Sequence, residues 1–445
     1  MGSQDPAPPG AQNGTIRADV AVIGGGVIGH AIAWEASRSG RSVVLIDEAP
    51  GSGASWAAAG MLAPVSELHY QEEDLLELML ASSTRWPGFA ADLAAASGES
   101  SGYLATPTLA VGADAADRRA LMDLRGVQQA NGLTVEPLTV REARRREPLL
   151  SPAIACALDT PADHKVDPRL LVSCLRRALA SHNSESNDNG PAVAGAEDGY
   201  AVRDRAVGLV WADGAVAGAR LAGGGSVLAG ETVVANGLDA AALAGLPEGL
   251  HLPLRPVHGD ILRLAVPRQL QPLVTSTVRG LVHGVPVYIV PREDGTVVIG
   301  ATQREDALAG RTNPSSTGAR SDAGAVSAGG VYQLLRDAQV LVPAVAELEL
   351  LECTARARPG TPDNAPLLGR VPTAGGPAAE GHGHVPGLII ATGFFRHGVL
   401  LAPAAAAICR DLMDGTADVR WKPFDPARFS GREPAATSFN IKETA

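Results

Sequence analysis

Three glycines and one acid near the start of the chain have the types and spacing of a phosphate-binding turn. Gly24, Gly26 and Gly29 form a Gly-x-Gly-x-x-Gly pattern. In such a pattern the first glycine permits a tight turn, the second lets the backbone approach a pyrophosphate, and the third allows close helix–strand packing. Asp47 follows Gly24 by 23 positions (47 − 24), near the ~20 expected for an acid that holds a ribose hydroxyl. These residues predict a dinucleotide site, and the acid favours FAD or NAD over NADP.

The elements around this turn are those that a dinucleotide site needs. Residues 18–23 form a short apolar run that stops at the glycines, and apolar residues recur at helical spacing over 27–38. Residues 42–46 form a second apolar run that ends at Asp47 and Glu48. Strand, turn, helix and strand predict a βαβ unit with a parallel sheet and a right-handed crossover. The start of the helix would aim N–H donors at the phosphates.

The rest of the chain reads as a mixture of helices and mainly antiparallel strands. We predict helices over 73–85, 116–130, 331–340 and 400–413, another opening at Asp167-Pro168, and a surface loop over 181–198. Strand-like runs cover 200–236, 260–266, 281–302, 348–357 and 387–392. Within them, 285–291 and 296–300 flank residues 292–295 as a hairpin.

Composition limits the class of protein. The chain is 45% hydrophobic and 19% charged, which predicts a folded protein. Its 445 residues predict two domains or one large composite. A net charge of −11 argues against nucleic-acid or anionic-membrane partners. The sequence contains no run of about 18 apolar residues, so we expect no membrane span. The N-terminus shows no signal-peptide pattern, and the scattered cysteines suit a reduced cytoplasm.

The cysteines and histidines show no metal-binding pattern. Cys156, Cys174, Cys353 and Cys409 form no C-x-x-C pair, so we expect ordinary buried, reduced thiols. His258, His283 and His397 are not spaced as a ligand set, and we predict no metal.

Four further segments carry a family resemblance. They are Ala54-Ser55-Trp56-Ala57-Ala58-Ala59-Gly60-Met61-Leu62; Tyr288-Ile289-Val290-Pro291 with Gly300-Ala301-Thr302; Arg356-x-Arg358-Pro359-Gly360-Thr361-Pro362-Asp363; and Ala391-Thr392-Gly393-Phe394-Phe395-Arg396-His397-Gly398. Together, and in this order, they resemble the D-amino-acid-oxidase family of flavoproteins, in its glycine oxidase branch associated with thiamine biosynthesis. The resemblance covers most of residues 18–414 and implies FAD, which we expect to be non-covalent because the surroundings of Cys353 do not match a covalent-flavin site.

The resemblance also implies site residues. Besides the glycines, it places FAD contacts at Val27, Ile28, Asp47, Glu48, Ala54, Ser55, Ala59, Gly60, Met61, Val207, Phe394, Phe395, Arg396, His397, Gly398, Val399 and Leu400. It places substrate contacts at Arg358, Arg396 and Tyr288.

The chemistry of these three residues fits such roles, although each has a plainer explanation. The planar guanidinium of Arg358 could hold a carboxylate bidentately, or could form a structural salt bridge. Arg396, at a predicted helix start, could stabilise negative charge on a reduced flavin, or could lie on the surface. Tyr288 could face the substrate, or could simply pack in its hairpin.

We therefore predict an α/β fold: a doubly wound, Rossmann-type FAD-binding domain with a second α+β substrate domain of mainly antiparallel sheet. The FAD domain is expected from residues 18–79, 149–246 and 352–415, and the substrate domain from 80–146 and 247–351. Residues 1–17 and 416–445 are expected to be tails.

The resemblance implies oxidative deamination of glycine or another small amine, such as sarcosine or D-alanine. The products would be the 2-oxo acid, ammonia and hydrogen peroxide, and dehydroglycine would be supplied for the thiazole of thiamine. Alternatives are a D-amino-acid dehydrogenase that passes electrons to a quinone, a flavin domain acting on tRNA, which the acidic charge disfavours, and a plain NAD dehydrogenase. Gln303 and Pro286 depart from some relatives near the substrate, so the rank order of amines stays open. Whether the protein forms a homo-oligomer or binds thiazole-pathway partners also stays open.

Overall fold

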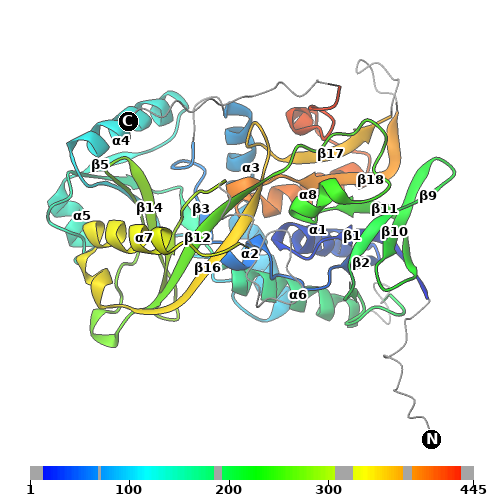
Figure 1. Cartoon of the computed structure of the whole chain (residues 1–445), viewed down its shortest axis with the longest axis horizontal. Coiled ribbons are helices and arrows are strands. Elements are labelled where there is room, and N and C mark those ends of the chain that lie inside the picture. The colour runs from blue at the N-terminus through cyan, green and yellow to red at the C-terminus, as the bar shows by residue number, and fades with distance from the viewer. Residues whose placement is uncertain (1–13, 69–71, 185–192, 306–323, 374–382, 432–445) are drawn as a thin grey trace, which may run out of the picture.

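The computed structural model describes residues 14–68, 72–184, 193–305, 324–373 and 383–431, which form two large sheets with helices packed against them (Figure 1). The first sheet has the strand order β17-β18-β11-β1-β2-β8, with β10 and β9 added beside β11. Its strands are β1 (Thr15–Ile23), β2 (Val43–Ile46), β8 (Ala201–Val202), β9 (Ala206–Ala212), β10 (Ala215–Leu221), β11 (Ser226–Val234), β17 (Leu367–Pro372) and β18 (His384–Thr392). The five strands from β18 to β8 are parallel, as the βαβ pattern predicts.

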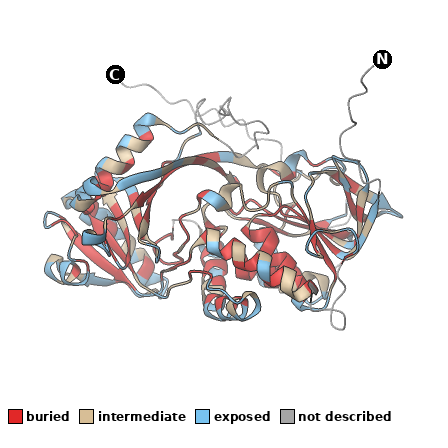
Figure 2. Cartoon of the chain, turned by 90° about the horizontal axis from the view of Figure 1, so that it is seen from below, coloured by how far each residue is buried: buried red, intermediate tan, exposed pale blue. Residues whose placement is uncertain are grey.

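Helices cover one face of this sheet, because their apolar sides are buried together with the apolar side chains of the strands. They are α1 (Val27–Arg38), α3 (Glu73–Ser97), α6 (Pro168–Ser184) and α8 (Ala402–Met413), and α1 lies against both α6 and α8. Figure 2 shows this region of the molecule largely buried, and α1 and α8 are buried along most of their length. The β9–β10 hairpin and its apolar neighbours belong to a separate buried cluster.

Helix α3 is longer than the helix predicted over 73–85. It continues through Pro87 to Ser97, although proline removes a backbone donor from a helix interior. Trp86, Phe89 and Leu93 are buried on its inner side, and the indole Nε1 of Trp86 donates to the carbonyl oxygen of Leu400 at 2.8 Å. Tertiary burial therefore outweighs the local break.

The second sheet has the order β16-β12-β15-β14-β13-β4-β6-β5 and is antiparallel except for the pair β13–β4. Its strands are β4 (Thr108–Gly112), β5 (Glu136–Leu138), β6 (Cys156–Thr160), β12 (Arg255–Ala265), β13 (Thr277–Val282), β14 (Val285–Pro291), β15 (Thr296–Gly300) and β16 (Glu349–Gly360). The predicted hairpin is confirmed as β14 and β15. Around this sheet lie α4 (Ala115–Ala130), α5 (Val140–Arg146) and α7 (Ala328–Leu341), while α2 (Ala54–Ala57), β3 (Met61–Leu62) and β7 (His164–Lys165) lie in the connections.

The predicted fold class, a doubly wound α/β layer with a second, mainly antiparallel layer, is confirmed. The domain boundaries stay a prediction, although two strands pair with strands expected in the other domain. β6 lies within a range expected in the FAD domain, and β16 lies there from residue 352 on. Each nevertheless pairs in the second sheet, with β4 and β12 respectively. The cross-strand partners of these segments are far away in the sequence, so local patterns did not reveal them.

Several predicted segment ends are wrong. Thr15 to Arg17 pair with Ser226 to Leu228 in β1, so they are not tail. Residues 416–431 include a short 3₁₀ helix, Val419–Phe424, whose Phe424 is buried against the helices. Helix α6 extends into the predicted 181–198 loop as far as Ser184. Residues 1–13, 185–192 and 432–445 lie outside the described residues. Among the described helices, none is both long and apolar enough to cross a membrane.

Candidate active site

A cavity of about 620 Å³ lies where the two sheets meet. It is lined by the glycine turn, by residues of the 51–68 segment, by β12, β14 and β16 of the second sheet, and by residues 391–400. Cofactor and small-molecule sites in proteins typically enclose about 300–1,000 Å³. The cavity is therefore the candidate site.

The glycine turn is built so that side chains are excluded. Gly24 has φ +109°, and a Cβ there would lie 2.6 Å from backbone atoms of Ala235 and Asn236. A Cβ on Gly29 would lie 1.8 Å from the carbonyl oxygen of Gly24. Gly26 caps α1 without a side-chain hydrogen bond, which leaves first-turn N–H groups available to an anion.

Asp47 and Ser55 fix this turn from two sides. Asp47 accepts N–H groups from Gly25 (2.6 Å to Oδ2) and Ala49 (2.8 Å to Oδ1), and Ser55 Oγ accepts the N–H of Val27 at 3.0 Å. A carboxylate offers about four acceptor sites, so Asp47 can hold the turn and still accept a ribose hydroxyl. The turn thus fits the diphosphate and ribose of a dinucleotide.

Nearly all of the predicted cofactor residues meet in this cavity. Those lining it are Gly24, Gly26, Val27, Ile28, Asp47, Ala54, Ser55, Ala59, Gly60, Met61, Phe394, Phe395, Arg396, His397, Gly398, Val399 and Leu400. Gly29 does not line the cavity; it lies behind the turn, where α1 packs closely against the Gly24 backbone. Glu48 and Val207 are not among the described residues that line the cavity, and their contacts with a cofactor stay predictions.

Arg358 and Tyr288, both predicted to contact the substrate, meet in the cavity. The guanidinium of Arg358 lies against Gly259, where a Cβ would be 2.5 Å from both Nη atoms, and it interacts with the Tyr288 hydroxyl. Nη1 of Arg358 is buried without a hydrogen-bond acceptor among the described residues. Burial raises the pKa of Tyr288 to about 12, so its hydroxyl stays protonated and can donate to an anion.

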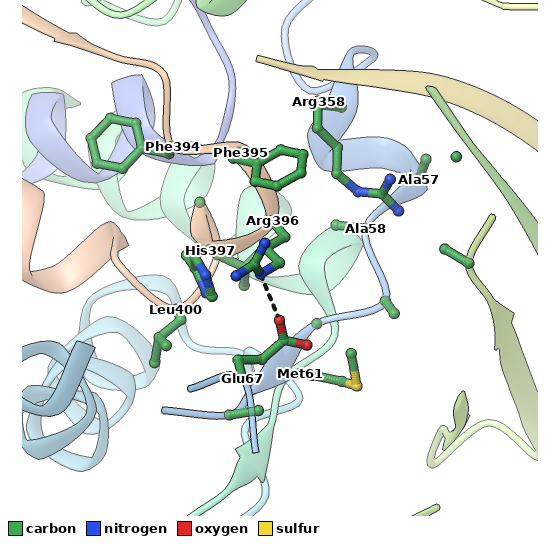
Figure 3. Close-up of a pocket in the computed structure, with 18 of the residues that line it drawn as sticks. Ala57, Ala58, Met61, Glu67, Arg358, Phe394, Phe395, Arg396, His397 and Leu400 are labelled. Carbon is green, nitrogen blue, oxygen red and sulfur yellow. Dashed lines mark ion pairs between the residues drawn. The ribbon is translucent and has the colours of Figure 1, made fainter. Parts of the chain in front are cut away.

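Arg396, by contrast, is already paired. Its Nε lies 2.9 Å from Glu67 Oε2, and its Nη2 lies 2.9 Å from Glu72 Oε2. Figure 3 shows the guanidinium of Arg396 above Glu67, while Arg358 points toward Ala57 and Ala58. Arg396 is therefore neither a surface residue nor an uncompensated cation.

Glu67 and Arg279 were not predicted. Arg279 lies opposite Tyr288 in the β13–β14 register and forms an ion pair with Glu67. Burial alone would raise the pKa of Glu67, but Arg279, His397 and Arg396 outweigh it and hold that pKa well below its usual range. Glu67 is thus charged at neutral pH, and a buried ion-pair network forms one wall of the cavity.

The contact between Gly259 and Arg358 supplies a prediction. In Gly259→Ala the new methyl group must displace the guanidinium, and a displacement of about 1 Å can lower turnover on the order of 100-fold. If Arg358 binds the substrate, as the resemblance implies, we expect kcat/KM to fall 10- to 100-fold, mainly through KM, with the cofactor retained. Steady-state kinetics with flavin quantified on the same sample would measure this. Gly126→Ala, where a Cβ meets nothing within 4 Å, is the control and should leave KM unchanged.

The other candidate groups lie elsewhere. Cys353 is exposed on β16, which corrects the expectation of four buried thiols: β16 is an edge strand, and its first residues are open to solvent. In the part of the chain that the structure describes, no three His, Cys, Asp or Glu side chains gather as a metal site. Gln303 and Pro286 both line the cavity.

The parallel strands, the glycine turn and Asp47 define a dinucleotide-binding protein with a second layer that closes its site. Residues 19–412 match the DAO family, described as FAD dependent oxidoreductase. The chain belongs to this family, and FAD is its cofactor.

Similar proteins cover nearly the whole chain. Glycine oxidase of Geobacillus kaustophilus is 31% identical over 418 residues, which are 94% of this chain and 97% of that protein. A crystal structure of glycine oxidase from Geobacillus kaustophilus has a TM-score of 0.75 at 30% identity, and covers 93% of this chain and 99% of that one. The bifunctional protein ThiO/ThiG of Trichormus variabilis is 28% identical over 95% of this chain but 56% of its own length, so this chain spans about half of it.

Proposed function

We propose that the protein is an FAD-dependent oxidase of glycine or another small amino acid, such as sarcosine or D-alanine. The observation that carries the proposal is the position of Arg358: its guanidinium faces the cavity beside the protonated Tyr288 hydroxyl, without an ion pair to any described carboxylate. The similarity to glycine oxidases supports the same substrate class.

In this proposal the residues of the chain bind and orient rather than transfer protons. Arg358 holds the substrate carboxylate through a bidentate, charge-assisted pair, and Tyr288 donates a further hydrogen bond. The small side chains of Ala57, Ala59 and Gly60 leave room for a planar ring. When bound, FAD accepts hydride from the carbon that bears the amine. Holding that carbon in place is a proximity effect. Overall, glycine, dioxygen and water would give glyoxylate, ammonia and hydrogen peroxide.

The test is a panel of amines assayed with two electron acceptors. Glycine, sarcosine and D-alanine should each be assayed for peroxide formation and, separately, for reduction of a quinone-like dye. Peroxide in step with amine consumption supports the oxidase. Strong dye reduction with little peroxide would instead favour a D-amino-acid dehydrogenase, and no turnover with any of the three would contradict the substrate class.

The state of the flavin is a separate prediction. Because Cys353 is exposed and is not among the described residues lining the cavity, we expect the purified protein to be yellow and its FAD non-covalent. Acid denaturation should therefore release FAD into the supernatant, identified by chromatography against FAD and FMN standards. Release of FMN, or flavin retained in the protein pellet, would contradict the prediction.

We further propose that the oxidised product, dehydroglycine, supplies the thiazole of thiamine in the cytoplasm. The support is the similarity to bifunctional ThiO/ThiG proteins. Restoration of growth in a bacterial strain that lacks glycine oxidation for thiazole synthesis would test it. Light scattering of the purified protein would show a homo-oligomer, and light scattering of its mixture with a thiazole-synthesis enzyme would show a complex.

A further inference from the structure

The cavity contains two arginines that no described carboxylate neutralises. Arg279 and Arg396 are ion-paired with Glu67 and Glu72. Arg356 and Arg358, two positions apart on β16, also line the cavity, and neither forms an ion pair within the described part of the chain. Residues two apart on a strand point to the same face, so both charges are directed toward the same space.

The guanidinium groups of Arg356 and Arg358 nevertheless lie against different segments of the chain. The guanidinium of Arg358 lies over Gly259, which is the residue opposite Arg356 in the β12–β16 register. Arg356 instead donates from Nε to the carbonyl oxygen of Ser52 at 3.4 Å, and from Nη1 to that of Ala355 at 2.9 Å. Its guanidinium is therefore held at the loop before α2.

That loop leads directly to the glycine turn. The N–H of Gly51 donates to the carbonyl oxygen of Gly25 at 2.7 Å, and Ser55, three residues beyond Ser52, accepts the N–H of Val27. Arg356 thus lies near the N-terminus of α1, on the side formed by the second sheet. An anion at that terminus would have backbone N–H donors on one side and a guanidinium within reach on the other.

We propose that Arg356 binds the diphosphate of FAD. A guanidinium matches phosphate oxygens bidentately, and the doubly charged diphosphate is the anion that the α1 terminus is built to receive. The two unpaired arginines then match two anions, Arg356 the diphosphate and Arg358 the substrate carboxylate. The proposal goes beyond the proposed function, because it holds whichever amine is oxidised.

The experiment measures FAD release from the holoenzyme without turnover. Holoenzyme is diluted at several KCl concentrations, and the equilibrium release of FAD is followed by the rise in flavin fluorescence. Loss of a charge-assisted contact should weaken FAD binding by about 10- to 100-fold in Arg356→Gln. The salt dependence should become flatter, since one screened attraction is gone. Arg356→Lys should recover part of the affinity, and KM for the amine at saturating FAD should not change.

Two controls distinguish the loss of a diphosphate contact from general damage to the fold. Arg203→Gln removes an exposed arginine paired with Glu197 and should leave FAD binding unchanged. Riboflavin, which lacks the phosphates, should bind wild type and Arg356→Gln equally. FAD affinity within twofold of wild type, an equal loss for riboflavin, or a raised KM for the amine with normal FAD binding would each overturn the proposal.

Discussion

Replacing Arg358 with alanine is expected to lower kcat/KM for glycine by roughly 30- to several-thousand-fold. A charge-assisted pair with a carboxylate in a desolvated site contributes about 2–5 kcal/mol, and about 1.4 kcal/mol corresponds to a factor of ten. Flavin occupancy should stay near that of wild type, because the role proposed for Arg358 is in binding the substrate and not the cofactor. Steady-state peroxide assays and flavin quantification on one preparation would give both values.

The conservative variant Arg358→Lys should recover only part of the loss, since an ammonium group lacks the planar fork. If Arg358 is instead structural, the alanine variant should lose FAD or thermal stability while any folded enzyme keeps its KM. An unchanged KM with full flavin occupancy would contradict the carboxylate-binding role.

The cofactor half of the site could be predicted because its determinants are local. The glycine turn needs Gly24 and Gly29 for contacts made within one βαβ unit and its neighbouring strand end, and such contacts constrain residue type at fixed spacing. The hairpin of β14 and β15 was predictable for the same reason, as a four-residue connection between two apolar runs.

The ion-pair network could not be predicted, because its members meet only through the tertiary fold. Glu67 follows the small-residue run, Arg279 is on β13, and Arg396 precedes α8, so more than 100 positions separate each arginine from Glu67 in the sequence. Helix periodicity and strand alternation carry no information about such partners. Sequence reasoning assigned Arg396 to cofactor and substrate, and missed that Glu67 and Glu72 already neutralise it.

Replacing Glu67 with glutamine should destabilise the protein by about 3 kcal/mol, because removing one partner of a buried pair leaves the other charges uncompensated. The side chains of Glu67, Arg279 and Arg396 are 11%, 21% and 14% exposed, so solvent would replace little of the lost attraction. Thermal melting of holoenzyme should show a Tm several degrees lower. Glu72→Gln should have a smaller effect, since Arg396 keeps Glu67 and Arg279 loses no partner.

The pH dependence of this effect follows from the lowered pKa of Glu67. A carboxyl group whose pKa is depressed in the folded protein contributes its full stability above its unfolded pKa, and loses it as the pH falls toward the folded value. The gap in Tm between wild type and Glu67→Gln should therefore be constant near neutral pH and narrow as the pH falls below 4.5, the ordinary value for glutamate. Adding Arg279→Met to Glu67→Gln should restore part of the stability at neutral pH, because it removes the stranded cation. If neither the acid dependence nor the double variant behaves so, the network contributes no net stability, and Glu67 acts on the cavity by its shape alone.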